Sequence, residues 1–245
     1  ELGFSLGNNK LKTSLSWSNG IRTPTLYELF GDRGSFKGND NLLPEEAETY
    51  ALSVKYNKSI SSVVFDISSS IYQQTLENSI VAIFNSSGTG SYTNVSNADL
   101  LGLELQVVSQ ITPNLSLSLQ AHIIDSETKS EYSAFNNKKL PGIYHQQYSA
   151  SLSYRMSDQW RIKVNSNIDK ELYFNRSNQF ESNQALNKNG NPAIREVTDI
   201  SLNWSIKKYS VNLSCSNLFD KNYQDLANRP AQGRSIQLKF SIEDI

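Results

Sequence analysis

The stretch Leu115-Ser116-Leu117-Ser118-Leu119-Gln120-Ala121 alternates strictly between apolar and polar residues. Successive side chains of a β-strand point to opposite faces, so this pattern predicts a strand with one apolar and one polar face. The same alternation returns at residues 160–165, 211–215 and 236–242. We find no comparable stretch with the periodicity of an amphipathic helix. The sequence therefore predicts an all-β protein.

Alternation of this kind along the whole chain predicts eleven strands, which are joined alternately by short turns and long loops. The strands are expected near residues 1–7, 10–21, 48–57, 61–75, 98–111, 115–126, 147–156, 160–174, 194–207, 210–219 and 233–243. The long loops are expected near residues 22–47, 76–97, 127–146, 175–193 and 220–232. Short turns at one end and long loops at the other are typical of an antiparallel up-and-down transmembrane β-barrel. A soluble β-sandwich has no reason to sort its loops in this way.

The composition excludes several other classes of protein. The chain has 245 residues, with 23 Lys and Arg against 24 Asp and Glu, which argues against a nucleic-acid-binding protein. Its longest purely apolar run is residues 80–84, whereas a membrane-spanning helix needs about 20 such residues. A single cysteine, Cys215, excludes an intrachain disulfide and a multi-cysteine metal site. The polar faces are rich in Ser, Asn and Gln, as expected for the lumen of a barrel.

Aromatic residues recur near the ends of the expected strands. They are Trp17, Tyr50, Tyr56, Tyr72, Tyr148, Tyr154, Trp160 and Tyr173. This placement fits the aromatic girdles that mark the two membrane interfaces of a barrel. Ordinary cross-strand pairing also enriches strands in aromatic residues, and the sequence leaves both explanations open.

The number of strands predicts an incomplete barrel. If the long loops all lie on one side, the strands at 1–7 and 233–243 run in the same direction, so they cannot close an antiparallel ladder. Single-chain bacterial barrels have even strand numbers. We therefore expect a partial barrel of about 11 strands: a trough with two free edges and a concave polar face. An odd number of strands is expected before Glu1.

Five segments, in this order, carry a resemblance to a known family. Residues 21–29 resemble a "FRAP…ELY/F" segment, and residues 38–45 resemble "GNPDLKPE". Residues 92–104 resemble "Y-x-N…A-x-x-x-G-x-E", and residues 139–145 resemble the "LPGxPxH" stretch before a strand. Residues 217–234 resemble the closing "NLFDKxY…PxxGR" signature. Their order over more than 200 residues resembles the C-terminal half of the barrel of a TonB-dependent outer-membrane receptor.

This resemblance implies a place and a function. Residues 1–245 would be the C-terminal half of a 22-stranded barrel in the outer membrane of a Gram-negative bacterium, in contact with its lipid. An N-terminal plug and the segment that contacts the TonB complex would lie outside this sequence. Receptors of this family take up scarce ligands, among them ferric siderophores, cobalamin, haem or a glycan, with energy from TonB. The alternatives are a passive porin or structural outer-membrane barrel and, third, a soluble β-sandwich binding module.

One departure from the family pattern bears on the ligand. Haem receptors of this family carry a His between the first two segments, and none stands between Arg22 and Asn39. This disfavours haem, makes a siderophore or cobalamin-type chelate the leading expectation, and leaves a glycan open.

The residues themselves predict neither an enzyme nor a metal or cofactor site. His122 and His145 are far apart in the sequence and show no metal-ligand spacing, and no serine stands in a nucleophile elbow. Aromatic side chains offer flat apolar contact, and Arg binds anionic chelates through paired hydrogen bonds. The candidate ligand-binding residues are therefore Arg22, Arg33, Phe36, Tyr132, Phe135, Tyr144, Arg176 and Phe180, all in the expected long loops. For each one alone, stiffening a loop or pairing with a carboxylate is the stronger expectation.

Overall fold

The computed structural model describes residues 2–8, 10–32, 34, 36–61, 63–84, 90–173, 176–178, 194–225 and 230–242. Its elements are β1 (Leu2–Gly7), β2 (Leu11–Arg22), α1 (Leu26–Phe30), β3 (Phe36–Lys37), β4 (Glu45–Ile60), β5 (Val63–Phe84), β6 (Gly90–Thr112), β7 (Leu115–Ser130), β8 (Tyr144–Arg155), β9 (Trp160–Leu172), β10 (Arg195–Ile206), β11 (Tyr209–Ser216) and β12 (Ser235–Ile242). No helix among these residues is long and apolar enough to cross a membrane.

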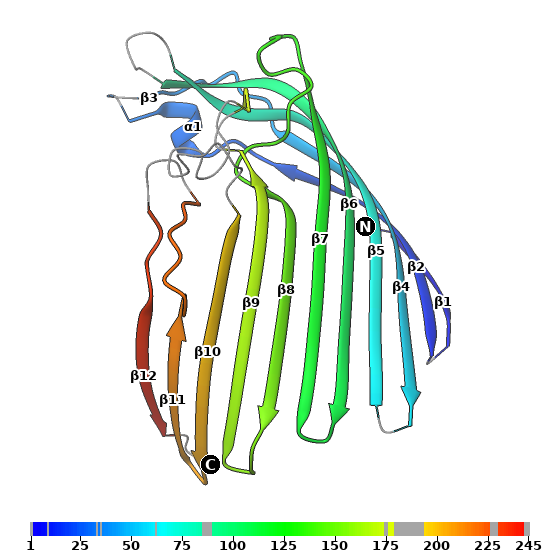
Figure 1. The fold of residues 1–245 in the computed structure, drawn as a ribbon. Coiled ribbons are helices and arrows are strands. Elements are labelled where there is room, and N and C mark those ends of the chain that lie inside the picture. The colour runs from blue at the N-terminus through cyan, green and yellow to red at the C-terminus, as the bar shows by residue number, and fades with distance from the viewer. Residues whose placement is uncertain are drawn as a thin grey trace.

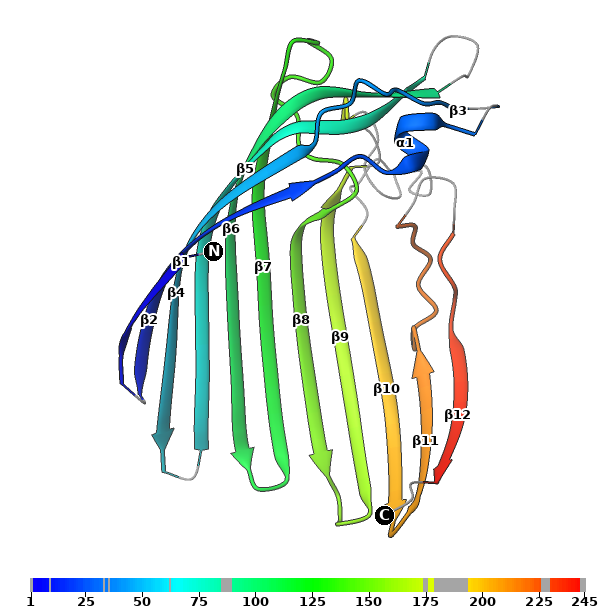
Figure 2. The same cartoon turned by 180° about the vertical axis from the view of Figure 1, so that it is seen from behind.

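Eleven of the strands form one antiparallel sheet in the order of the chain, β1-β2-β4-β5-β6-β7-β8-β9-β10-β11-β12. The sheet curves into a trough, with β1 and β12 at its two sides (Figures 1 and 2). Among the described residues β1 pairs only with β2, and β12 only with β11. The predicted all-β partial barrel with two free edges is therefore confirmed.

Short turns join the strands at one end of the trough, which we call the turn end, and longer connections lie at the opposite loop end (Figure 1). The upper parts of β5 and β6 bend over the loop end toward α1 and β3 in both views (Figures 1 and 2). Residues 36–37 pair in parallel with residues 90–91 of β6. This pairing ties the loop between β2 and β4 to the bent strands.

One sequence prediction in this region is wrong. The loop expected at 76–97 is for the most part strand, because β5 continues to Phe84 and β6 starts at Gly90. A register shift between Leu76 and Ile80 interrupts the alternation, and the run Ile80–Phe84 then resumes pairing because its residues favour strands. The sequence also gave no sign of a helix by periodicity, whereas residues 26–30 form α1. Five residues are too few to show a helical period.

The outer face of the sheet is apolar along its middle. Leu52, Ile71, Leu105, Leu119 and Leu152 are all exposed on it. Aromatic residues lie on both sides of this zone: Trp17 pairs with Tyr50 across β2 and β4 in the halves nearer the loop end, and near the turn end Tyr154, Trp160, Trp204 and Tyr209 accompany the hairpins. The rings of Trp160 and Trp204 have centroids 6.4 Å apart.

Two of the aromatic residues expected at the girdles lie elsewhere. Tyr72 turns inward, and its hydroxyl lies 2.9 Å from Nε2 of His122. Tyr173 packs edge-on against the buried ring of His145, with centroids 5.8 Å apart. Alternation places residues on a face only where the register is known, and these two positions lie on the inner side.

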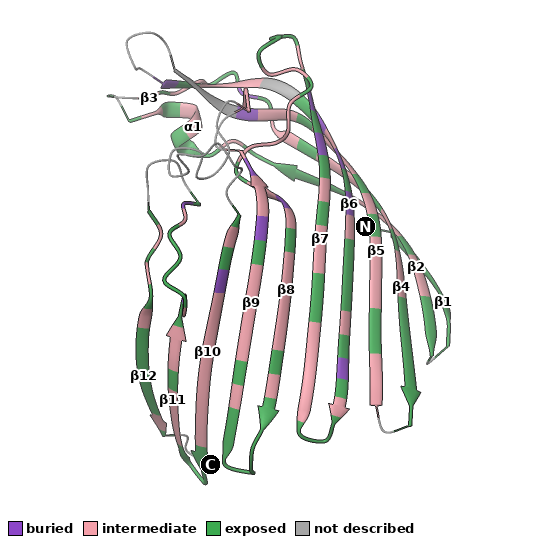
Figure 3. Ribbon diagram, in the orientation of Figure 1, coloured by how far each residue is buried: buried purple, intermediate pink, exposed green. Residues whose placement is uncertain are grey.

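Burial is concentrated near the loop end (Figure 3). Among the described residues, and apart from Ser109 and two glycines, the buried ones are Leu42, Ile80, Ala98, Leu100, Ser126, Thr128, His145, Asp169, Leu172, Val197, Asn217 and Gln224. A single curved sheet cannot bury its own middle, so ordered packing arises only where loops fold back onto strands. This packing holds the candidate site in place.

Candidate functional site

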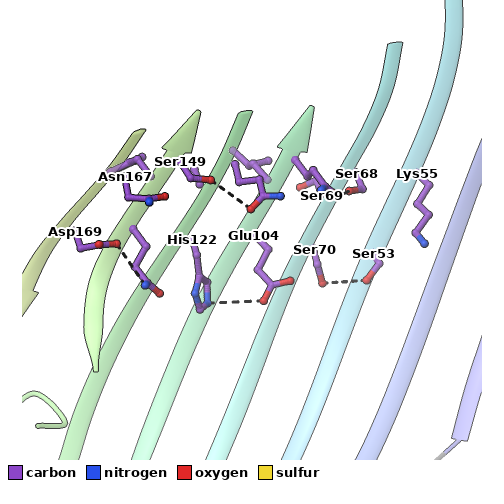
Figure 4. A pocket seen from close by; sticks show the side chains of 16 residues that line it. Ser53, Lys55, Ser68, Ser69, Ser70, Glu104, His122, Ser149, Asn167 and Asp169 are labelled. Atoms are coloured by element: carbon purple, nitrogen blue, oxygen red, sulfur yellow. Dashed lines mark hydrogen bonds and ion pairs between the residues drawn. The ribbon is translucent and has the colours of Figure 1, made fainter. Parts of the chain in front are cut away.

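The inner face carries a polar hollow of about 630 Å³ between β4 and β9. Its side chains stand in two rows that follow the register of the strands (Figure 4). The row nearer the loop end is Ser53, Ser70, Glu104, His122, Gln147 and Asp169, and the next is Lys55, Ser68, Gln106, Gln120, Ser149 and Asn167. The predicted polar concave face is therefore present, and it offers hydrogen bonds of both kinds with few charges.

A close contact between neighbouring strands shapes this face. A Cβ atom added to Gly102 would lie 2.0 Å from Cζ of Tyr72, so the phenol ring lies directly over the glycine. The ring position lets the Tyr72 hydroxyl reach His122, whose Nε2 lies 3.8 Å from Oε1 of Glu104. Gly102 is therefore needed for side-chain space, as expected for a glycine inside a strand.

At the loop end, α1 begins with a capping box. The N–H of Glu28 donates to Oγ1 of Thr25 at 3.3 Å, and the N–H of Thr25 donates to Oε2 of Glu28 at 2.6 Å. Gly31 ends the helix with φ 68°, a conformation that favours glycine. The spacing Thr-x-x-Glu is the sequence signal that could have found this helix.

The capping glutamate also belongs to a cluster of charges around Arg22. The Arg22 guanidinium lies 3.1 Å from Glu28 and 2.5 Å from Glu45. Burial opposes ionisation of Glu28, but hydrogen bonds from Thr25 and Arg22 hold the pKa of this carboxyl below its ordinary value. Arg22, a predicted ligand contact, is thus fastened to two carboxylates and orients α1 on the strand ends.

Two further candidates lie near this cluster. Phe36 stacks on Tyr92, with centroids 5.4 Å apart, and lies 5.9 Å from the ring of Tyr27. Burial lowers the pKa of the Arg176 guanidinium to about 10, while the charge of Glu45 acts in the opposite direction. Arg176 therefore remains a cation at neutral pH, and it interacts electrostatically with Glu45, the carboxylate that Arg22 binds.

The remaining described candidates form two separate groups. Tyr132 and Phe135 pack together in the β7–β8 loop with centroids 6.1 Å apart, and Tyr132 is 56% exposed. The hydroxyl of Tyr144 donates to Oδ1 of Asp225 at 2.6 Å. Arg33 and Phe180 lie outside the described residues. The structure thus places Arg176 under the electrostatic influence of Glu45, the carboxylate that binds Arg22, and packs Tyr132 against Phe135, but it does not bring the whole set together.

Sequence reasoning missed a network centred on Arg195. Its guanidinium lies 5.0 Å from the ring centroid of Tyr223 and 5.8 Å from that of Tyr144, and its Nη1 lies 3.5 Å from Asp225. Its Nε lies 3.5 Å from Oδ2 of the buried Asp169, which also lines the inner hollow. Arg195 therefore connects the β11–β12 loop to the inner face. The only signal in the sequence is an arginine at the first position of a strand.

His145 anchors the β7–β8 loop. Nε2 of this fully buried ring forms a hydrogen bond with Oγ of Ser126 at 2.7 Å, and its Nδ1 lies 2.9 Å from the carbonyl oxygen of Glu171. A carbonyl only accepts, so Nδ1 carries a proton. The N–H of Leu140 donates to the same Ser126 hydroxyl at 2.9 Å. His145 is therefore structural, and the described residues contain no cluster of three or more His, Cys, Asp or Glu that could hold a metal ion.

These features define a polar-lined partial barrel with a packed loop end, and the sequence comparison agrees. The family model described as "TonB dependent receptor-like, beta-barrel" matches residues 4–218, so the chain belongs to this family. No curated protein matches the chain.

Solved structures of the same fold cover nearly all of the chain. The copper transporter OprC is 17% identical with a TM-score of 0.74, over 96% of this chain and 37% of its own. The siderophore receptor PiuA from Acinetobacter baumannii is 20% identical with a TM-score of 0.73, over 98% and 35%. A ferric enterobactin receptor mutant from Pseudomonas aeruginosa, PfeA, solved with enterobactin, is 14% identical with a TM-score of 0.70, over 98% and 40%. The chain thus spans little more than a third of these proteins.

Proposed function

We propose that the full-length protein is an outer-membrane receptor that takes up a metal chelate of the siderophore or cobalamin type by TonB-coupled transport. The observation that carries the proposal is a family barrel whose inner face is polar and whose loop end gathers cationic and aromatic side chains. The remaining strands, the plug and the TonB-contacting segment would be supplied by a part of the protein that precedes Glu1.

The arrangement at the loop end favours an anionic, partly aromatic ligand. Arg176 adds a cation near Glu45, where Arg22 is already paired with two carboxylates, and Phe36, Tyr132, Phe135 and Tyr144 add aromatic surface. Such groups bind chelates through charge-assisted hydrogen bonds and ring contacts. We propose these residues, together with Arg33 and Phe180, as contacts for the chelate.

The test is growth of a strain that lacks the receptor gene, with the full-length gene restored and single iron chelates or cobalamin as the source. Rescue on one chelate, lost when TonB is also deleted, is the expected result. Rescue that does not need TonB would instead indicate a passive pore, and no rescue on any chelate would refute the proposal.

A matched pair of variants addresses the site. Arg176→Gln removes a positive charge at the loop end, and Arg161→Gln makes the same change in β9 near the turn end. We expect weaker uptake of the rescuing chelate only for Arg176→Gln, at equal amounts of receptor in the membrane. Equal uptake by both variants would remove Arg176 from the binding site.

A further inference from the structure

A second hollow lies at the loop end, away from the inner face. It measures about 600 Å³, which is within the ~300–1,000 Å³ of typical small-molecule sites. Asn78 of β5, Asn97 of β6 and Asn136 and Tyr132 of the β7–β8 loop contribute to its wall. None of its lining residues lines the inner hollow. The site therefore stands apart from the polar rows of the trough.

The carboxamides in this wall are held in fixed orientations. Oδ1 of Asn97 accepts from the N–H of Asn78 at 3.2 Å, and Oδ1 of Asn136 accepts from the N–H of Ser130 at 3.1 Å. Oδ1 of Asn94 accepts from the N–H of Leu43, and its Nδ2 donates to the carbonyl oxygens of Leu43 and Asn78. Because each oxygen is bound to the backbone, the Nδ2 groups of Asn97 and Asn136 are directed away from it.

These Nδ2 groups are free donors. Within the described part of the chain neither has a hydrogen-bond partner, and the same holds for the Tyr132 hydroxyl and the Glu131 carboxylate. Lys129, which also lines the hollow, is paired with Asp99. The hollow thus offers fixed amide donors, a hydroxyl, one free acceptor and an exposed aromatic ring, and its one cation is already neutralised.

We propose that this hollow is a saccharide-binding site. A sugar presents many hydroxyl groups, which need donors and acceptors together, and C–H faces that pack on an aromatic ring such as that of Tyr132. Anions are disfavoured, because the free charge in the wall is the Glu131 carboxylate. The saccharide belongs either to the uncharged outer sugars of a lipopolysaccharide of the same membrane or to a neutral soluble glycan, since both present hydroxyl groups and C–H faces without negative charge.

The experiment measures binding of the detergent-solubilised, full-length protein to an array of immobilised saccharides. One arm carries neutral soluble oligosaccharides, and the other carries the uncharged outer-chain oligosaccharides released from lipopolysaccharide. Saturable binding in the first arm identifies a soluble glycan as the source, and binding in the second identifies the membrane. No binding in either arm would overturn the proposal.

Variants then assign the binding to the hollow. The double change Asn97→Asp with Asn136→Asp keeps each fixed oxygen and removes both free donors, so we expect affinity to fall about tenfold or more, which corresponds to about 1.4 kcal/mol. Asn114→Asp makes the same chemical change in the β6–β7 turn and should leave binding unchanged.

A second pair of variants tests the aromatic ring without new charge. Tyr132→Ala should weaken binding, whereas Tyr132→Phe retains the ring and should retain most of the affinity. Wild-type affinity in both the double Asn variant and Tyr132→Ala would place the saccharide elsewhere and refute the site. Tyr132 is also among the proposed chelate contacts, so the double Asn variant, which leaves that ring in place, separates the two proposals: it should lose affinity for the saccharide and still support growth on the chelate.

Discussion

The contact between Gly102 and Tyr72 allows a quantitative test of how the inner face is built. In Gly102→Ala the new Cβ would lie 2.0 Å from Cζ and 2.2 Å from Cε1 of Tyr72. The ring must move, and the hydrogen bond to His122 is then lost. Overpacking typically costs about 1–3 kcal/mol, and a hydrogen bond about 0.5–1.5 kcal/mol. Because the ring is the far end of a side chain and can turn, we expect the free energy of unfolding to fall by about 1–3 kcal/mol.

The assay is urea unfolding of the full-length protein in lipid vesicles, followed by tryptophan fluorescence. Gly20→Ala serves as the control, since nothing lies within 4 Å of the Cβ position there. Replacing a strand glycine by alanine without a clash should stabilise the fold by about 0.5–1 kcal/mol. The two Gly→Ala variants are therefore expected to change stability in opposite directions.

A double-mutant cycle identifies the cause. In a Tyr72→Ala background the clash is absent, so Gly102→Ala should no longer cost stability and should instead stabilise the fold by about 0.5–1 kcal/mol, as Gly20→Ala does. In a Tyr72→Phe background the ring remains, and most of the cost should remain with it. An unchanged cost of Gly102→Ala after removal of the ring, or no cost in the wild-type background, would refute the reasoning.

Three further changes probe other parts of the structure. Ser126→Ala removes the hydroxyl that binds the Leu140 N–H and the buried imidazole of His145, so the free energy of unfolding should fall by about 1–3 kcal/mol. Hydrogen exchange should accelerate at the Leu140 N–H, and slow exchange there would contradict the role of Ser126 in holding the β7–β8 loop. The backbone N–H groups that follow Asp32 hold the pKa of its carboxyl below the ordinary value. The loop between β2 and β4 should therefore keep its order above about pH 4 and lose it only as the pH falls through this lowered pKa. Hydrogen exchange measured against pH checks the sign, and loosening of this loop already near neutral pH would disprove it. Leu105→Lys places a charge on the apolar outer face and should lower the free energy of unfolding in lipid vesicles by about 2–4 kcal/mol. Gln106→Lys, one residue along and facing inward, should lower it far less. Equal losses in the two variants would mean that the faces are misassigned.

The strands could be predicted closely because their information is local. A period of two is visible in any six residues, and β7 begins at Leu115, the first residue of the predicted strand. Prediction failed where local pattern and pairing disagree. The bulge after Leu76 broke the alternation, and only pairing with β6 shows that residues 80–84 remain strand.

The candidate site was less accessible to sequence reasoning. Composition picked out loop Arg and aromatic residues, but a sequence does not show which carboxylate each cation meets. Arg22 binds Glu45, which is 23 residues away, and Arg195 meets Asp225 across 30 residues. Tyr72 was assigned to a girdle because its sequence position resembles a strand end, whereas its contact with Gly102 of the next strand sets its direction. Such contacts depend on register between strands, which no single segment encodes.

The order of the strands in the sheet has a consequence for how such a molecule comes into being. Apart from the two-residue pairing of β3 with β6, each strand of the main sheet pairs only with the strands before and after it in the sheet, so the entropy of closing each pair is that of one local connection. A hairpin is therefore the natural unit of growth: it can be added at either edge without rethreading what has already formed. The same property lets a gene lengthen or shorten by whole hairpins, since the loss or gain of one leaves every other pairing in register.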